Sequence, residues 1–367
     1  DMGLLPPTGG RSGAQRLIRT AILTALTIGG LVMALPFLLM FSGATRTGVD
    51  AHAFSLIPRF LTDDTVLFQK YIEAKYNESP ALLRATWEVD VASFDEVTLL
   101  SDPDPERVEA WTAFLQQQEV RPEERFAGFS YAPSSRSRPW LVRQYLNHQR
   151  AQTDGDVARL NERLHTTFPS WNAFQVLPPD GRTREGYVED SPWWRAWYRF
   201  VNEDTPAWAT GIHNLSGFYH ERVTRTREGR DAPRISWQEA PAESREPFLR
   251  GMVHPAFLHL SPQAGEEWRA FLQRRHGSLQ GLKQATGIAA DSWRAVPLPT
   301  RYRDTGDLQA DWLAFVEGWL DLEDDVLLKA PLDHISLQSV EMEWRRKTGT
   351  APPFRERDQQ LFRRHRS

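Results

Sequence analysis

The sequence predicts a mainly α-helical protein. One N-terminal transmembrane helix at 20–45 is followed by a helical-repeat extracytoplasmic domain at 46–344 with short extended segments. Three observations support this prediction. An apolar run without charge lies between Arg19 and Arg46, everything after it is polar, and one sequence motif occurs three times. Together they predict an anchored protein with most of its residues outside the bilayer.

The uncharged run is long enough to span a membrane, because about 20 apolar residues cross a hydrocarbon core. Pro36 lies within it, and proline is tolerated in spanning helices. Residues 1–19 form a short cytoplasmic arm in this interpretation. The arm carries the arginines Arg11, Arg16 and Arg19. Positive residues before the helix predict a cytoplasmic N-terminus and an extracytoplasmic main domain.

A removable signal peptide is the alternative interpretation of this run. The small residues Ser42, Gly43 and Ala44 would suit a cleavage site. The apolar part of a signal peptide has about 7–15 residues, and this run is longer. The pattern therefore favours a retained anchor in a bacterial inner membrane.

The repeated motif reads LRATWEVDVASFDEVTL from Leu83, LNERLHTTFPSWNAFQV from Leu160 and LKQATGIAADSWRAVPL from Leu282. Each copy has serine followed by an aromatic residue at the same offset. A single helical unit cannot bury its aromatic face alone, whereas stacked units can. The repeat core is expected to comprise Leu83, Phe94, Leu160, Trp171, Leu282 and Trp293.

Aromatic helices flank each copy of the motif and extend it into a larger unit. The less regular segment at about 206–262 is expected to be an insertion, and 345–367 a basic C-terminal tail. A basic tail can be solvated or can contact anionic lipid. The three repeat units are expected at about 66–118, 140–203 and 264–322.

Composition excludes several kinds of partner and cofactor. The chain has no cysteine, which rules out disulfides and thiolate metal sites. Its formal net charge is -4 although the C-terminal end is basic, so the middle is acidic. Nucleic acid is therefore not an expected partner.

Motifs of common enzymes are missing from the sequence. It contains no GxxxxGK[ST], no HExxH and no GxSxG, and its histidine pairs do not have a metal-ligand spacing. No catalytic residue, metal or cofactor is expected, and the protein is not expected to be an enzyme. Five carboxylates could still supply a pair for glycoside hydrolysis: Glu88, Asp95, Glu96, Glu239 and Glu243.

Fourteen tryptophans make up the most prominent compositional signal. Trp193, Trp194 and Trp197 are candidate ligand or partner contacts, because exposed tryptophans stack on sugar rings. The alternative is that they are core residues between repeats, since tryptophan buries a large area. Adjacent residues cannot share one helix face, so Trp193 or Trp194 should point away from the core.

The segment LVMALPFLLMFSGATRTGVD resembles the first transmembrane helix of binding-protein-dependent sugar ABC transporter permeases of the maltose type. FLQRRHGSLQGLKQATG and SFDEVTLL are similar to segments in the large extracytoplasmic insert of some members. The resemblance implies the first helix and insert of a longer permease. It also implies a second permease subunit, a cytoplasmic ATPase and an extracytoplasmic sugar-binding protein as partners.

The leading hypothesis is therefore the membrane-anchored part of a carbohydrate ABC transporter permease. Its extracytoplasmic domain would contact a solute-binding protein or the substrate. One alternative is an anchored carbohydrate-binding or glycoside-hydrolase-like module outside the cell. A helical scaffold that binds another protein is a third hypothesis.

Overall fold

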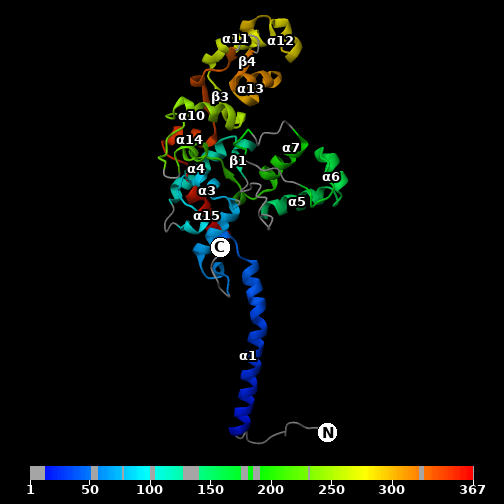
Figure 1. The fold of residues 1–367 in the computed structure, drawn as a ribbon, viewed down its shortest axis with the longest axis vertical. Coiled ribbons are helices and arrows are strands. Elements are labelled where there is room, and N and C mark those ends of the chain that lie inside the picture. Colours follow the sequence, from blue (N-terminus) through cyan, green and yellow to red (C-terminus); the bar gives the residue numbers. More distant parts are fainter. Residues whose placement is uncertain are drawn as a thin grey trace. The chain divides into compact units, whose positions relative to one another are not determined.

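The computed structural model describes residues 13–50, 57–76, 78–99, 104–126, 140–174, 181–184, 191–229, 232–321 and 326–366. It confirms a mainly helical protein with one long apolar helix near the N-terminus and few, short strands (Figure 1). The chain divides into two units, 1–70 and 71–367, and the division falls inside helix α2 (Asp64–Lys75).

Helix α1 (Gly13–Ala44) dominates the first unit. Its segment Arg16–Ala44 has a mean hydropathy of 2.2 and is long and apolar enough to cross a membrane, a property that signal sequences share. Its large apolar side chains are exposed, so they require apolar surroundings. Beyond its end, Lys70 Nζ donates to the carbonyl of Thr45 at 2.8 Å and pairs with Asp50 at 2.9 Å. A cation is favourable there because helix C-termini carry partial negative charge.

The second unit continues with helices in the order α3 to α15 (Figure 1). Their bounds are α3 (Pro80–Trp87), α4 (Pro105–Gln117), α5 (Trp140–Gln152), α6 (Val157–Leu164), α7 (Pro192–Arg199), α8 (Leu215–Tyr219), α9 (Arg225–Glu228), α10 (Ala242–Pro247), α11 (Gly265–His276), α12 (Leu279–Thr286), α13 (Gln309–Glu317), α14 (Val340–Thr348) and α15 (Phe354–Arg366).

The strands of this unit form antiparallel pairs among the described residues. They pair β1 (Arg125–Phe126) with β2 (Gly211–Ile212), β3 (Leu258–Leu260) with β6 (Ile335–Leu337), and β4 (Trp319–Asp321) with β5 (Val326–Leu328). The β3–β6 pair joins segments far apart in the sequence. It therefore places the start of α14, which follows β6, near β3, which comes after α10 in the chain.

Each copy of the sequence motif begins inside an eight-residue helix, namely α3, α6 or α12. Each helix begins at a side chain that accepts a backbone N–H, and each ends at a residue in the left-handed conformation. The N-caps are Ser79, Asp156 and Ser278, and the C-caps are Glu88, His165 and Gly287. Polar N-caps satisfy N–H groups that the helix leaves open, which explains these boundaries.

Buried apolar side chains form separate clusters. One cluster joins α5, α6 and α7 through residues such as Tyr145, Leu160 and Trp197. Another joins α8 and the segment 248–260 after α10 to α11–α13 and β6. The expected insertion at 206–262 therefore shares a core with the helices that follow it.

The expected repeat core is only partly buried. Leu83, Leu160 and Leu282 are each fully buried, and Phe94 is also buried. Trp171 and Trp293 are half-buried. The Trp171 indole donates to the carbonyl of Gly155 at 2.7 Å, while the Arg150 guanidinium lies over its ring. An indole N–H needs an acceptor, which holds this ring at the edge of its cluster.

The basic segment at 345–367, expected as a tail, comprises the end of α14 and the packed helix α15. Asp358 on α15 is buried and accepts hydrogen bonds from Lys75 Nζ and Tyr76 OH at 2.5 Å each. The Trp87 indole donates to the same carboxylate at 3.0 Å. Burial lowers the pKa of Lys75, and Asp358 opposes this effect. One carboxylate thus ties α15 to the end of α2 and to α3.

Replacing Asp358 with Asn should strongly destabilise the second unit, because it leaves the Lys75 ammonium buried without a counter-charge. Breaking a buried pair from one side costs about 3–5 kcal/mol. Urea unfolding of the full chain in detergent, followed by circular dichroism, measures the loss. Asp333→Asn is the matched control, because Asp333 lies in an exposed pair with Arg245. Equal stability of the two variants would contradict this role of Asp358.

Candidate functional site

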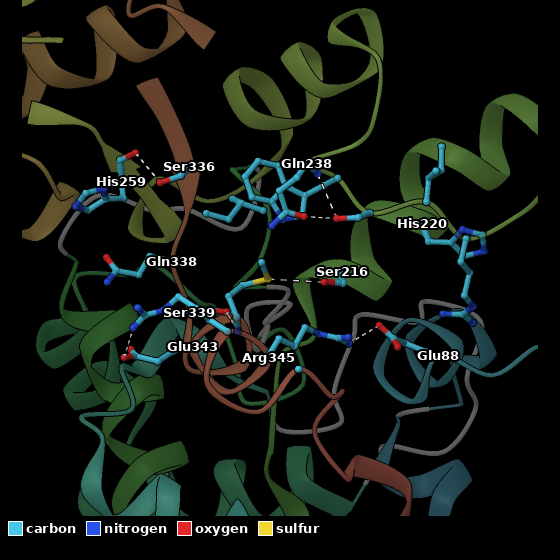
Figure 2. A pocket seen from close by; sticks show the side chains of 18 residues that line it. Glu88, Ser216, His220, Gln238, His259, Ser336, Gln338, Ser339, Glu343 and Arg345 are labelled. Carbon is cyan, nitrogen blue, oxygen red and sulfur yellow. Dashed lines mark hydrogen bonds and ion pairs between the residues drawn. The ribbon is translucent and has the colours of Figure 1, made fainter. Parts of the chain in front are cut away.

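An open cavity of about 1060 Å³, with many polar and charged residues in its wall, lies in the second unit (Figure 2). Its wall comes from the C-cap of α3, from α8 and the turn after it, from the loop at 234–238, and from β3, β6 and α14. Arginines, glutamates, amides and hydroxyls line it together with a few apolar side chains. Such a mixture suits a ligand with many hydrogen-bonding groups.

Glu88 and Arg345 form the central ion pair of this wall, with 2.6 Å between Oε1 and Nη2 (Figure 2). Asn214 also donates to Glu88 Oε1, at 3.3 Å. Glu88 is the left-handed C-cap of α3, with a φ of 57°. This conformation is costly for a residue with a side chain, and the two contacts stabilise it.

Arg345 also pairs with a second carboxylate, that of Glu341 one turn earlier on α14. The Glu341 side chain is fully buried. Burial raises its pKa to about 7; Arg345 opposes the rise, and Glu88 adds to it. Arg345 therefore connects a buried carboxyl group to one on the cavity wall.

The start of α14 is fixed by a buried glutamate outside the helix. Glu124 accepts the Val340 N–H at 2.6 Å and pairs with Arg121 at 2.8 Å. Arg121 also donates to the carbonyl of Gln338 at 3.0 Å. A carboxylate is favourable at a helix N-terminus, where N–H groups lack partners. These contacts set the position from which Arg345 reaches the cavity.

His220 belongs to a π-helical turn at His220–Thr224 that interrupts the helix running from α8 to α9. Turns of this kind are frequent at functional sites because they shift the following side chains on the helix surface. His220 is buried, and its pKa is lowered by burial and by Arg234. The pKa of His259 on β3 is lowered by burial and by Arg301. Both imidazoles are therefore neutral at neutral pH.

The predicted candidates Trp193, Trp194 and Trp197 do not line this cavity. Trp194 stacks on Tyr198 and Trp197 packs edge-on against Tyr145, and both indoles are buried. A ring enclosed in a core has no free face, so the burial of these two indoles favours the core alternative for them, and ligand contact stays a prediction. Trp193 is half-buried against Phe168, consistent with the different directions of adjacent helical residues.

Of the five carboxylates considered for hydrolysis, Glu88 alone lines the cavity. The cavity's other glutamate is Glu343, which sequence reasoning missed together with Arg234, Arg345 and His220. The i,i+4 spacing of Glu341 and Arg345 was the available local signal. No group of residues in the described part of the chain could hold a metal ion.

Comparison with known proteins finds no matching family model, no matching curated protein and no matching solved structure.

Replacing Glu341 with Gln should flatten the pH dependence of stability. The folded chain holds a proton on Glu341 up to pH 7, whereas an unfolded glutamate releases it near pH 4.5. Stability therefore falls as pH rises between these values, by roughly 1–3 kcal/mol for this group. Thermal unfolding from pH 4.5 to 8 measures the slope in both chains. Glu343→Gln is the matched control, and an unchanged slope in Glu341→Gln would contradict the assignment.

Proposed function

We propose that the protein is the membrane-anchored part of a carbohydrate ABC transporter permease, whose extracytoplasmic domain receives a sugar. The open polar cavity is the observation that carries this proposal. Sugar hydroxyls both donate and accept hydrogen bonds. The amides of Gln238 and Gln338 and the hydroxyls of Ser216 and Ser336 offer both functions along its wall.

The character of α1 supports the membrane part of the proposal. Its exposed apolar surface over Arg16–Ala44 needs a lipid environment. The two arginines at its N-terminal end, Arg16 and Arg19, favour a cytoplasmic start. The second unit is then extracytoplasmic. A second permease subunit, a cytoplasmic ATPase and a sugar-binding protein are the partners that we propose with it.

We further propose that the second unit contains three related helical repeats. The common eight-residue helices α3, α6 and α12, with their polar N-caps and left-handed C-caps, support a shared origin. Each is preceded by a longer helix, namely α2, α5 or α11. Stacked units of this kind bury faces that one unit would leave exposed.

An anchored glycoside-hydrolase-like module is the second candidate, because Glu88 and Glu343 lie on the same cavity. Arg345 pairs with Glu88 at 2.6 Å, and Arg346 pairs with Glu343 at 3.2 Å. Glycoside hydrolysis needs one carboxylic acid that gives its proton to the leaving group. Carboxylates that are both engaged by arginine suit this role poorly, so transport is the stronger proposal.

Filling the cavity should abolish sugar uptake. A strain that lacks the gene is tested with radiolabelled sugars, and the sugar whose uptake is lost is assayed again with variants. Gln338→Trp places an indole in the cavity and should lower uptake by about tenfold or more. The matched control is Gln280→Trp, on the exposed surface of α12 outside the cavity. If the deletion strain takes up every tested sugar as fast as the parent strain, the transport proposal is contradicted.

Protease added to intact spheroplasts should digest the second unit, because Arg16 and Arg19 at the N-terminal end of α1 favour a cytoplasmic start and, in the proposed topology, a second unit outside the cell. Antibody detection of a C-terminal tag measures the digestion. Permeabilised spheroplasts and a cytoplasmic marker protein are the controls. Protection of the second unit in intact spheroplasts, with digestion after permeabilisation, would reverse the orientation.

A further inference from the structure

We propose that the cavity binds a sugar that carries a carboxylate, a uronic acid or a short oligomer of it, with Arg234 as the residue that anchors the carboxylate. This inference rests on the proposed function and specifies its substrate class. Arg234 lies on the cavity wall at 234–238, between α9 and α10, and it is exposed there. It makes no hydrogen bond or ion pair with any residue in the described part of the chain.

The carboxylates that attract Arg234 are Glu88, Glu221 and Asp90. Each of them is already bonded to another arginine. Glu88 pairs with Arg345 at 2.6 Å, Glu221 with Arg84 at 2.8 Å, and Asp90 with Arg225 at 3.1 Å. The negative charge of these carboxylates therefore acts on Arg234. The N–H donors of Arg234 bond to none of them and are available to a ligand.

The surroundings of Arg234 favour an anion. Partial burial of the guanidinium lowers its pKa, and the residue remains exposed on the cavity wall, where a ligand can reach it. A guanidinium presents N–H donors in a planar fork that fits a carboxylate with two parallel hydrogen bonds. A ligand carboxylate would give this guanidinium a charged partner, which forms a stronger hydrogen bond than a neutral hydroxyl does.

The charge balance of the cluster fits one negative charge. Four arginines, Arg84, Arg225, Arg234 and Arg345, face four acidic residues, Glu88, Asp90, Glu221 and Glu341. Burial raises the pKa of Glu341 to about 7, so below pH 7 this residue is largely protonated. The cluster then carries an excess positive charge. The neutral imidazoles of His220 and His259 do not add to it.

The remaining wall is suited to the ring of a sugar. Ile235, Trp237 and Met342 contribute apolar surface, and Gln238 and Gln338 contribute amides. Sugar rings have an apolar face and a rim of hydroxyls. The face can pack on the apolar side chains, and the hydroxyls can form hydrogen bonds with the amides. The volume of about 1060 Å³ is also at the upper end of small-ligand pockets, which leaves room for more than one ring.

Isothermal titration calorimetry of the full chain in detergent tests this inference. The probes are D-galacturonate and digalacturonate, with D-galactose as the neutral counterpart and galactose 1-phosphate as the phosphorylated one. The uronates should bind about tenfold or more tightly than galactose, because a charge-assisted bidentate contact is worth at least 1.4 kcal/mol. Arg234→Gln should remove this preference, and Arg234→Lys should keep part of it. Arg227→Gln, on the exposed surface of α9, is the matched control.

The outcomes separate this inference from the proposed function. Equal binding of galactose and uronate in the wild-type chain would overturn the inference and leave a neutral-sugar site. Tighter binding of the phosphorylated sugar than of the uronates would overturn the carboxylate assignment and identify a phosphate as the preferred group. A uronate preference that survives Arg234→Gln, in a variant with unchanged melting temperature, would overturn the role of Arg234. Binding of no sugar would overturn the cavity as a sugar site altogether.

Discussion

Asp358 accepts hydrogen bonds from Lys75, Tyr76 and Trp87, and the arrangement of the second unit depends on this buried contact. It is made by residues more than 270 positions apart in the chain. Around it, Trp344 and Phe354 pack edge-on against Trp111, which holds α14 and α15 on α4. The C-terminal segment is therefore part of the core that supports the cavity wall. A buried ion pair stabilises a fold less than apolar packing would, but it tolerates few alternative arrangements, since a displaced charge would lie unpaired.

Arginine–carboxylate contacts extend from this support to the cavity. Arg121 and Glu124 hold the start of α14, and Arg345 then joins Glu341 to Glu88 at the end of α3. The planar guanidinium can bond two carboxylates at once, so a single side chain couples two helices. Among the described residues, Arg234 makes no hydrogen bond or ion pair within this network. In our proposal the paired charges keep the wall rigid, and Arg234 attracts the anion.

The same pairing supports our proposal that the cavity binds a ligand and does not hydrolyse it. Its two glutamates are engaged by arginines, and its histidines are kept neutral by burial and by neighbouring cations. Groups that already share their hydrogen bonds reorganise little when a polar ligand enters. Such preorganisation lowers the cost of binding.

Local features of the sequence determined the elements of this protein. The run without charge predicted the apolar helix α1, because the length and hydropathy of such a run are local features of the chain. Leu83, Leu160 and Leu282 were predicted to be buried and are buried. The cavity could not be predicted, because Glu88, Arg234 and Arg345 come from distant segments that only tertiary packing brings together. Tertiary packing also decided the burial of Trp194 and the position of α15. An amphipathic or aromatic pattern predicts that a helix face will be buried, but which segment covers that face depends on the whole chain.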